Sequence, residues 1–361
     1  MKGALFEKSG PKKERVFSLA PRNHSKSLPL LAITMGDPAG IGPEIIVKAL
    51  GRASVWKMCR PLVIGSHPIM EHTAQHLGIP SHVVLVHDPH ERANRPSFRP
   101  GTIPVCDPFR QPLNHIPQGR PSALAGRASA EYIRTAVRLA QRGAVNGLVT
   151  APINKKSMHL AGYAYPGHTE FLASLTRTQK VGMMILGGPL KILFATTHVA
   201  IRDLSQALTG RCVSQAIRLA HQGLTQLFHI ARPRIGIAGL NPHAGDNGLF
   251  GHEEQRVIAP AIRRAQASGL SCSGPHPADT LFGKAVRGEY DGVVAMYHDQ
   301  GLVALKTVAF GHCVNLTVGL PIIRTSVDHG TAYDIVGQGT ADPSSLIEAI
   351  TLAARLTTRA N

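Results

Sequence analysis

Three histidines of this chain each follow a short apolar run. His198 follows KILFATT, His243 follows RIGIAGLNP and His298 follows DGVVAMY. Such runs of Ile, Leu, Val and Ala are typical of buried strands. Because ligands of open α/β sheets bind beyond the carboxyl ends of strands, three imidazoles there could hold one divalent metal and leave a coordination position for a substrate. One histidine in this context is more often an ordinary polar residue at a strand end, but the threefold repetition favours a metal site.

A second set of residues could bind an anion. His168 and Thr169, in PGHTEF, lie at an expected helix start, where backbone N–H groups attract negative charge; simple helix capping is an equal alternative. Lys306, Asn315 and Arg324 recur at a constant interval further along. Arg324 follows the apolar GLPII and could bind a phosphate or carboxylate through its planar fork of donors. Lys306 would add a point charge, although a surface lysine is an open alternative for it.

Two glycine-containing segments lie between expected elements. Residues 35–45 (MGDPAGIGPEI) predict a tight turn from a strand into a helix, but they match neither the dinucleotide fingerprint nor the Walker loop. Residues 326–343 (SVDHGTAYDIVGQGTADP) form a polar, glycine-rich loop that is similar to loops around nucleotides. The spacing within this loop does not by itself establish a nucleotide site.

The elements that must position these residues alternate between short strands and longer helices. Strands are expected at 31–34, 62–64, 83–86, 147–150 and 183–186 and before each of the three histidines, and helices at 43–50, 126–142, 212–229 and 252–268. Residues 88–122, rich in Pro, Asn, Arg and Gln, are expected to form a long irregular connection. This alternation predicts an α/β fold with a largely parallel sheet.

Composition narrows the class of protein. A chain of 361 residues predicts about two domains, and 43% hydrophobic with 17% charged residues is typical of a soluble globular protein. No apolar run is long enough for a membrane helix, and the polar, basic residues 1–28 lack the hydrophobic region of a secretory signal and are expected to be a disordered extension. The five cysteines are scattered without a C-x-x-C pair, which favours a reducing, cytoplasmic location.

The net charge of +17 raises the question of nucleic-acid binding. The basic residues are spread along the whole chain, and aromatic residues make up only 5% of it, so platforms for stacking bases are scarce. An anionic substrate attracted by a positive surface explains the charge better. A non-catalytic, nucleic-acid-binding role would not account for the three histidines.

Eight motifs together resemble the 4-hydroxythreonine-4-phosphate dehydrogenase family of pyridoxine biosynthesis. They are ITMGDPAGIGPEI, VTAPINKKSM, PGHTEF, ATTH, GLNPHAG, GPHPADTLF, AMYHDQG and IRTSVDHGTA, and the similarity runs from about residue 30 to 355. The resemblance implies a two-domain fold like that of isopropylmalate and isocitrate dehydrogenases, with mostly parallel sheets and the active site in the cleft between domains. Residues 29–140 with 308–361 would form the first domain, and residues 141–307 the second, which would bind metal and substrate and form the dimer.

The resemblance also implies roles for single residues, each of the type that the family has at that position. The metal ligands would be His198, His243 and His298, drawn from both subunits of a homodimer with its active site at the subunit interface. The substrate-binding residues would be His168, Thr169, Lys306, Asn315 and Arg324, with Asp279 near the same site. NAD or NADP would lie against Asp328, His329, Gly330 and Asp334. One divalent metal (Zn, Co, Mg or Mn) would serve each site, and a membrane or nucleic-acid partner is not expected.

The implied reaction is the oxidation of 4-phosphooxy-L-threonine at C3, followed by loss of CO2 to give 3-amino-2-oxopropyl phosphate. A divalent metal on the C3 hydroxyl would lower the pKa of that hydroxyl, and a water or Asp279 would accept its proton. Relatives that oxidise 4-phospho-D-threonate or 4-phospho-D-erythronate remain an open alternative, because their substrates present similar groups. Relatives that oxidise a dihydrodiol dicarboxylate are disfavoured because PGHTEF is intact in this chain.

Overall fold

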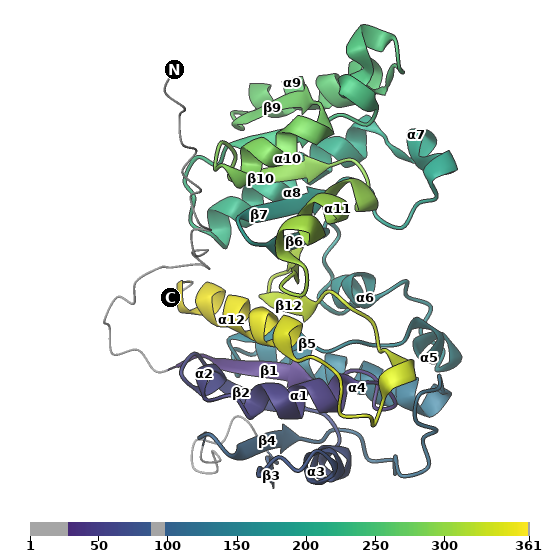
Figure 1. The fold of residues 1–361 in the computed structure, drawn as a ribbon, viewed down its shortest axis with the longest axis vertical. Helices are drawn as coiled ribbons and strands as arrows, with labels where there is room; N and C mark the ends of the chain where they lie inside the picture. The colour runs from purple at the N-terminus through teal and green to yellow at the C-terminus, as the bar shows by residue number, and fades with distance from the viewer. Residues whose placement is uncertain (1–27, 88–97, 360–361) are drawn as a thin grey trace, which may run out of the picture.

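The computed structural model describes residues 28–87 and 98–359 (Figure 1). The expected extension over residues 1–28 therefore lies, apart from Leu28, outside the described residues. No helix in the described part of the chain is long and apolar enough to cross a membrane.

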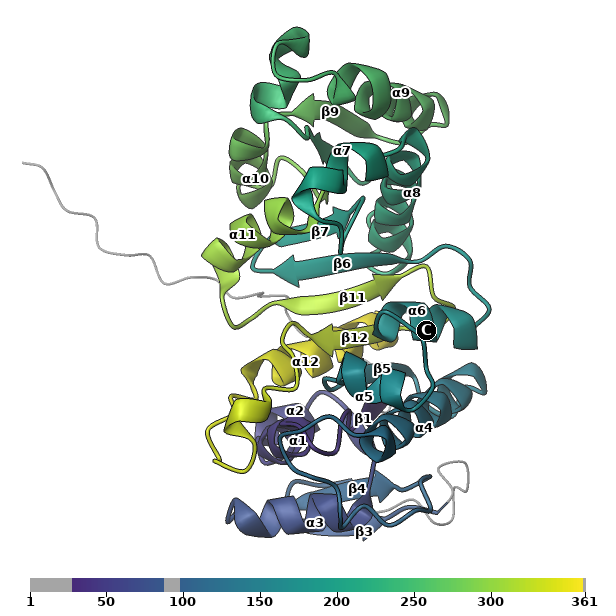
Figure 2. The same ribbon diagram turned by 90° about the vertical axis from the view of Figure 1, so that its right-hand side faces the viewer.

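Strands from the whole described chain form one sheet in the order β3-β4-β2-β1-β5-β12-β11-β6-β7-β10-β8-β9. Their bounds are β1 Leu30–Thr34, β2 Arg60–Ile64, β3 His82–Leu85, β4 Thr102–Cys106, β5 Gly147–Thr150, β6 Gly182–Gly187, β7 Leu190–Phe194, β8 Ile235–Ala238, β9 Cys272–His276, β10 Gly292–Ala295, β11 Val314–Val318 and β12 Arg324–Val327. The first half of the sheet, from β3 to β12, is parallel, and so is the outer part of the second half, from β7 to β9. Among the described strands, antiparallel pairings occur only where β11 and β6 join the halves (Figure 2).

Helices cover both faces of this sheet (Figure 2). Their bounds are α1 Gly42–Leu50, α2 Ala53–Trp56, α3 His67–His76, α4 Ala123–Gln141, α5 Lys155–Leu160, α6 His168–Leu175, α7 Leu204–Ala207, α8 Gly210–Gln226, α9 Ala259–Ala267, α10 Ala278–Val286, α11 His298–Ala309 and α12 Ser344–Arg359. In the first half, α12 and α4 pack on opposite faces, and in the second half α8 and α11 do. The predicted α/β class with a mostly parallel sheet is confirmed.

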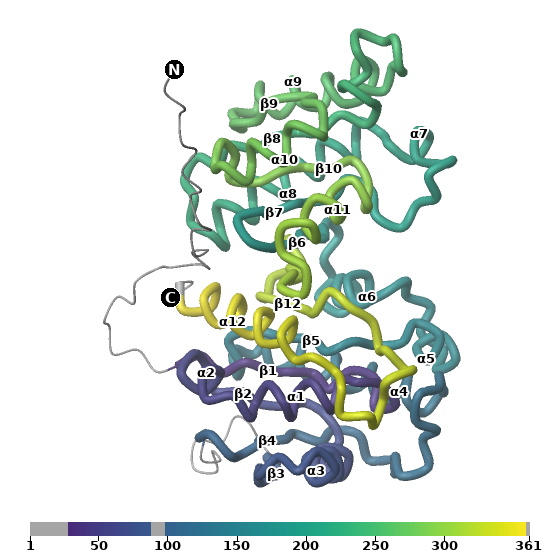
Figure 3. The backbone as a smooth tube through the Cα atoms, viewed as in Figure 1, coloured from purple at the N-terminus to yellow at the C-terminus, as the bar shows by residue number. Residues whose placement is uncertain are grey.

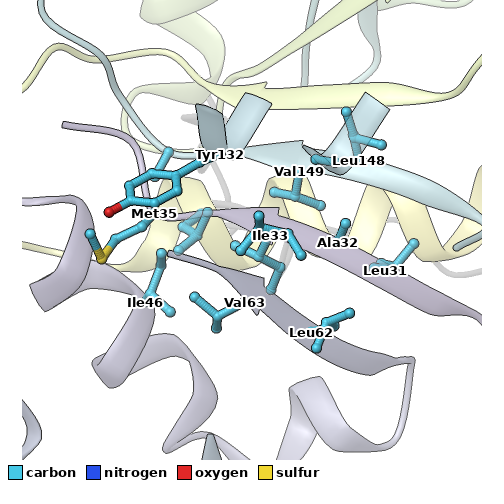
Figure 4. Close-up of a cluster of buried hydrophobic side chains, with 14 of the residues drawn as sticks. Leu31, Ala32, Ile33, Met35, Ile46, Leu62, Val63, Tyr132, Leu148 and Val149 are labelled. Atoms are coloured by element: carbon cyan, nitrogen blue, oxygen red, sulfur yellow. The ribbon is translucent and has the colours of Figure 1, made fainter. Parts of the chain in front are cut away.

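Continuous burial of the central strands and local capping of the helices explain why these segments fold as they do. Leu31 and Ile33 of β1 pack beside Val63 of β2 and Val149 of β5 in the core of the first half (Figure 4). Burying an aliphatic side chain of this size contributes about 1.5–3 kcal/mol. At the start of α4, the Oγ of Ser122 accepts a hydrogen bond from the backbone N–H of Ala125, an N-cap that fixes where the helix begins.

The hydrophobic core divides between the two halves of the sheet. One cluster of buried side chains lies in the first half and includes Leu148, Met158 and Phe171, while two clusters lie in the second half. The chain passes from the first half to the second between α6 and β6, and it returns between β11 and β12 (Figure 3). The domain limits expected at residues 141 and 308 stay predictions.

The expectation of an irregular connection over residues 88–122 is wrong in one respect. Strand β4 lies within this stretch, is buried along its whole length, and pairs in parallel with both β2 and β3. Proline is rare inside a sheet because it has no N–H to donate. Pro104, in the middle of this segment, is therefore the reason that no strand was predicted here. Pairing with β2 and β3 places β4 in the sheet although it contains a proline.

Candidate active site

A pocket of about 560 Å³ opens beside the middle of the sheet, where its two halves meet. Its lining comes from the residues after β5, the start of α6, strands β6, β11 and β12, and the end of β7. The predicted site residues in this lining are His168, Thr169, His198, His298, Asn315, Arg324, Asp328, His329 and Gly330. The structure thus brings together residues of all three predicted sets in one place.

Arg324, on β12, is the most deeply buried charged group of this pocket, with only 1% of its surface exposed. Its Nε and Nη2 donate hydrogen bonds to the Oγ1 of Thr150, and its Nη1 donates to the Oγ1 of Thr317. Burial lowers the pKa of Arg324 to about 9, with the carboxylate of Glu170 opposing the shift, so the guanidinium remains protonated at neutral pH. No carboxylate in the described residues lies within 4.0 Å of it. A buried cation in this state favours binding of an anion.

Two further polar atoms of the pocket lining are buried and lack a partner in the described structure. They are the Nε2 of His168, at the start of α6, and the side-chain oxygen of Asn315, on β11. Burial, and then the positive charge of Arg324, hold the pKa of His168 well below its usual value, so its ring is neutral at pH 7. A buried polar atom without a hydrogen bond costs about 1–3 kcal/mol, so a polar ligand that bonded to these atoms would recover that energy.

His198 and His298 lie side by side at the pocket, with their ring centroids 6.0 Å apart. His198 follows β7, and His298 is the first residue of α11, which follows the neighbouring parallel strand β10. Burial, and then electrostatic repulsion from Lys155 and His298, lowers the pKa of His198, which favours the neutral imidazole that binds metals. The Nδ1 of His298 lies 2.6 Å from the Oδ1 of Asp299, an arrangement that directs Nε2 away from the carboxylate.

His243 does not join this pair within the single chain. It follows β8, the next parallel strand beyond β10, so the three predicted ligands do follow adjacent strands. Residues 243–247 all have positive φ and form a left-handed turn, in which the ring of His243 lies 6.2 Å from that of Phe250. Among the residues that the structure describes, no three His, Cys, Asp or Glu side chains are placed to hold a metal ion.

The turn that carries His243 is held by one buried carboxylate. The Oε1 of Glu254 accepts hydrogen bonds from the backbone N–H groups of Leu240 and Asn241, and its Oε2 accepts one from the side chain of Asn241. Left-handed backbone is costly for residues other than glycine and persists where surrounding contacts enforce it. Glu254 supplies such contacts for the His243 turn.

The remaining predicted residues lie outside the pocket lining. Lys306, on α11, pairs with Asp328 at 3.2 Å and so contacts the lining through that residue. Asp279 lies in the first turn of α10 and is exposed, and Asp334 lies in the 3-10 helix Tyr333–Ile335. Thr150, which binds Arg324, and Asp299 are not among the residues predicted from the sequence, although the adjacency of Asp299 to His298 is a signal for the latter.

A second, larger cavity of about 800 Å³ lies against the first half of the sheet. Gly40 and Pro43 of the glycine-rich turn line it, together with Val336 and Gly337 of the predicted nucleotide loop. Residues 328–337 therefore extend from the lining of the first pocket to that of the second. Between them, the hydroxyl of Tyr333 donates a hydrogen bond to Asp37 at 2.9 Å, which joins the nucleotide loop to the glycine-rich turn.

The fold and the pocket together define an α/β enzyme whose site combines a buried cation with paired histidines. Residues 57–353 match the family model described as pyridoxal phosphate biosynthetic protein PdxA. The chain belongs to the PdxA family.

Proteins with similar sequences and structures are consistent with membership of this family. The chain is 47% identical over 340 residues to the D-threonate 4-phosphate dehydrogenase of Cupriavidus necator, covering 93% of this chain and 99% of the relative. It is 46% identical over 326 residues to the 4-hydroxythreonine-4-phosphate dehydrogenase of Desulfosudis oleivorans, covering 90% and 95%. The crystal structure of 4-hydroxythreonine-4-phosphate dehydrogenase from Klebsiella pneumoniae matches with a TM-score of 0.83 and 42% identity, covering 91% of this chain and 99% of that one. This chain is accordingly an enzyme of the dehydrogenase class.

Proposed function

We propose that the chain oxidises a phosphorylated 3-hydroxy acid at C3, with NAD or NADP as the hydride acceptor, and that loss of CO2 follows. The first candidate substrate is 4-phosphooxy-L-threonine, which would yield 3-amino-2-oxopropyl phosphate in vitamin B6 biosynthesis. The observation that carries the proposal is Arg324, a protonated, buried side chain without a carboxylate partner in the described residues, in a pocket that also contains His198 and His298.

The substrate phosphate would bind to Arg324 and to the neighbouring groups that lack partners. Arg324 would offer a charge-assisted hydrogen bond, and His168, neutral at pH 7, would donate from Nε2. Thr169 and Asn315 line the same space. Lys306, which contacts Asp328 of the pocket lining, would add positive charge at the edge of this pocket. Holding the phosphate in this way fixes the distance from C3 to the nicotinamide.

The chemistry requires that the C3 hydroxyl lose its proton as hydride leaves C3. The resulting 3-oxo acid can lose CO2 because its carbonyl accepts the electrons of the breaking bond. A water or Asp279 is the candidate acceptor of the hydroxyl proton, and Asp279 would have to approach the pocket from its place on α10.

The imidazole side chains of these histidines are suitable ligands for a divalent metal. The His198–His298 pair, the lowered pKa of His198 and the contact of His298 with Asp299 are the features that favour ligation. His198, His243 and His298 would hold the ion, which would be Zn, Co, Mg or Mn. When bound, such an ion supplies a Lewis acid that lowers the pKa of a substrate hydroxyl.

A homodimer would complete this set of ligands with a histidine from a second copy. Near His198, Ile201 is 79% exposed, and beyond His243, Leu249 and Phe250 are 74% and 48% exposed. Large apolar side chains that face solvent beside incomplete site residues favour coverage by a partner. The predicted second domain, residues 141–307, contains all of these residues and would form the interface.

The cofactor would extend along the predicted nucleotide loop. Asp328, His329 and Gly330 line the first pocket, where the nicotinamide would meet C3, and Asp334 lies further along the loop. The adenosine would then reach the larger cavity, whose lining includes Val336 and Gly337.

A second candidate substrate is 4-phospho-D-threonate, which is favoured by the 47% identity to the Cupriavidus necator enzyme; 4-phospho-D-erythronate belongs to the same class. The test is to follow reduction of NAD and NADP with 4-phosphooxy-L-threonine and with 4-phospho-D-threonate, before and after chelation. Turnover of the first compound that chelation abolishes and a divalent metal restores supports the proposal. Preference for 4-phospho-D-threonate would leave the proposed site unchanged and make that compound the substrate. Turnover unaffected by chelation contradicts the metal site.

A further inference from the structure

A cavity of about 290 Å³, separate from the two already described, lies between α12 and the β6–β7 hairpin. One wall belongs to the last helix, which packs on the first half of the sheet, and the other to strands of the second half. Most of its lining is apolar: Leu186, Leu190, Phe228, Ile230, Leu352 and Leu356. An occupant of this cavity would contact both halves of the molecule.

Lys191, on β7, is partly buried, and its ammonium group lies in this apolar lining. Burial lowers the pKa of Lys191, and the charge of Asp291 partly opposes that shift. Asp291 itself is bonded to Arg234 at 3.1 Å. In the described structure the ammonium group makes no hydrogen bond or ion pair; its Nζ lies 5.5 Å from the centroid of the Phe228 ring. Because a cation that is partly withdrawn from water and has no acceptor gains from a nearby negative charge, the cavity favours an occupant that brings one.

A second cation, Arg355, also lines the cavity. The single acidic side chain in the lining, Glu348, lies 3.5 Å from the Nδ1 of His312. The carboxylate of Glu348 therefore faces His312. Positive charge beside a ring and aliphatic side chains matches a ligand with a flat apolar body and one anionic group.

We propose that this cavity is a binding site for a small aromatic anion, a carboxylate or phosphate on a single ring, with Lys191 as its charge partner and the Phe228 ring against its apolar body. The volume suits a one-ring compound and excludes a dinucleotide, since pockets for larger organic ligands begin at about 300 Å³. The site does not depend on the proposed dehydrogenase reaction. By contacting α12 and β7 together, the bound anion would link the two halves of the molecule.

The test uses the full-length protein and 4-fluorobenzoate, whose binding is followed by fluorine NMR. The neutral 4-fluorobenzamide has the same shape and serves as the charge control. We expect the acid to bind at least tenfold more tightly than the amide, and Lys191→Met to abolish that difference. Lys191→Arg, which keeps the charge, should retain it. Lys57→Met, which removes an exposed lysine at the end of α2 that is not part of the cavity lining, is the matched control and should bind as the parent does.

Binding in the active-site pocket must be distinguished from binding here. Thr169→Glu places a carboxylate in the active-site pocket lining, in the first turn of α6, where an acid suits the helix. We expect this variant to bind 4-fluorobenzoate normally. The proposal is overturned if Thr169→Glu loses binding while Lys191→Met keeps it, if acid and amide bind equally, or if the parent binds neither compound.

Discussion

The side-chain amide of Gln300 donates a hydrogen bond of 2.7 Å to the backbone carbonyl of Gly239. Its Oε1 accepts another, also 2.7 Å long, from the backbone N–H of Met296. Gly239 begins the loop that carries His243, and Gln300 lies in the first turn of the helix that begins at His298. One amide thus sets the spacing between the ends of β8 and β10.

Replacing this amide should loosen both loops. Gln300→Leu leaves the Gly239 carbonyl and the Met296 N–H without their partner, so we expect the free energy of unfolding to fall by about 1–3 kcal/mol. Divalent-metal affinity, measured by calorimetric titration, should fall as well, because the loop bearing His243 is no longer fixed. Thr307→Val, which removes an exposed hydroxyl contact on the same helix, is the control. Weakened stability with unchanged metal affinity would confine Gln300 to a structural role.

Because of Arg324, we expect phosphate to stabilise the folded protein. Since the guanidinium is a buried charge without a carboxylate partner among the described residues, inorganic phosphate should raise the melting temperature of the parent protein. Arg324→Met, which lacks the charge, should gain nothing from phosphate. Its kcat/KM should fall roughly 100-fold, the loss expected for about one charge-assisted hydrogen bond. Equal phosphate shifts in both proteins would contradict this role.

Because of His168, we expect the folded protein to lose stability as the pH falls. The folded-state pKa of this residue lies well below the usual value of 6.5, because burial and Arg324 disfavour the protonated ring. The unfolded chain therefore takes up the proton first as the pH falls. The contribution of His168 is complete above pH 6.5, and below it declines by up to about 1.4 kcal/mol per pH unit until the folded-state pKa is reached.

The measurement is denaturant unfolding between pH 7.5 and pH 5. His168→Gln has no ring to protonate, so its stability should fall less steeply over this range than that of the parent. His159→Gln, at an exposed position on α5, should follow the parent. Identical slopes for the parent and His168→Gln would mean that His168 is protonated in the folded protein.

The sequence could predict the strands that precede the three histidines better than the arrangement of those strands. The apolar runs before His198, His243 and His298 are local signals, and each of these strands is present. The order β7-β10-β8, which makes them neighbours, depends on pairing between segments far apart in the chain. The bond between Arg324 and Thr150 is of the same kind, because it joins residues 174 positions apart that meet only when β12 pairs with β5. Strand β4 is a case in which the local signal was misleading. Its proline argues against a strand, but the segment pairs with β2 and β3 in the folded protein.

The exposed side chain of Ile201 provides a test of the proposed dimer. Ile201→Asp places a charge on a position that is 79% exposed in the single chain and would be buried in a homodimer. We expect sedimentation to show a shift from dimer to monomer, and metal affinity to fall with it, since a histidine from the second copy would be withdrawn. Val303→Asp, on the outer surface of α11 and 67% exposed, tests whether the effect belongs to the Ile201 surface or to any loss of exposed apolar area. If the parent protein sediments as a monomer and still binds the metal, His198 and His298 must bind the ion without a second copy.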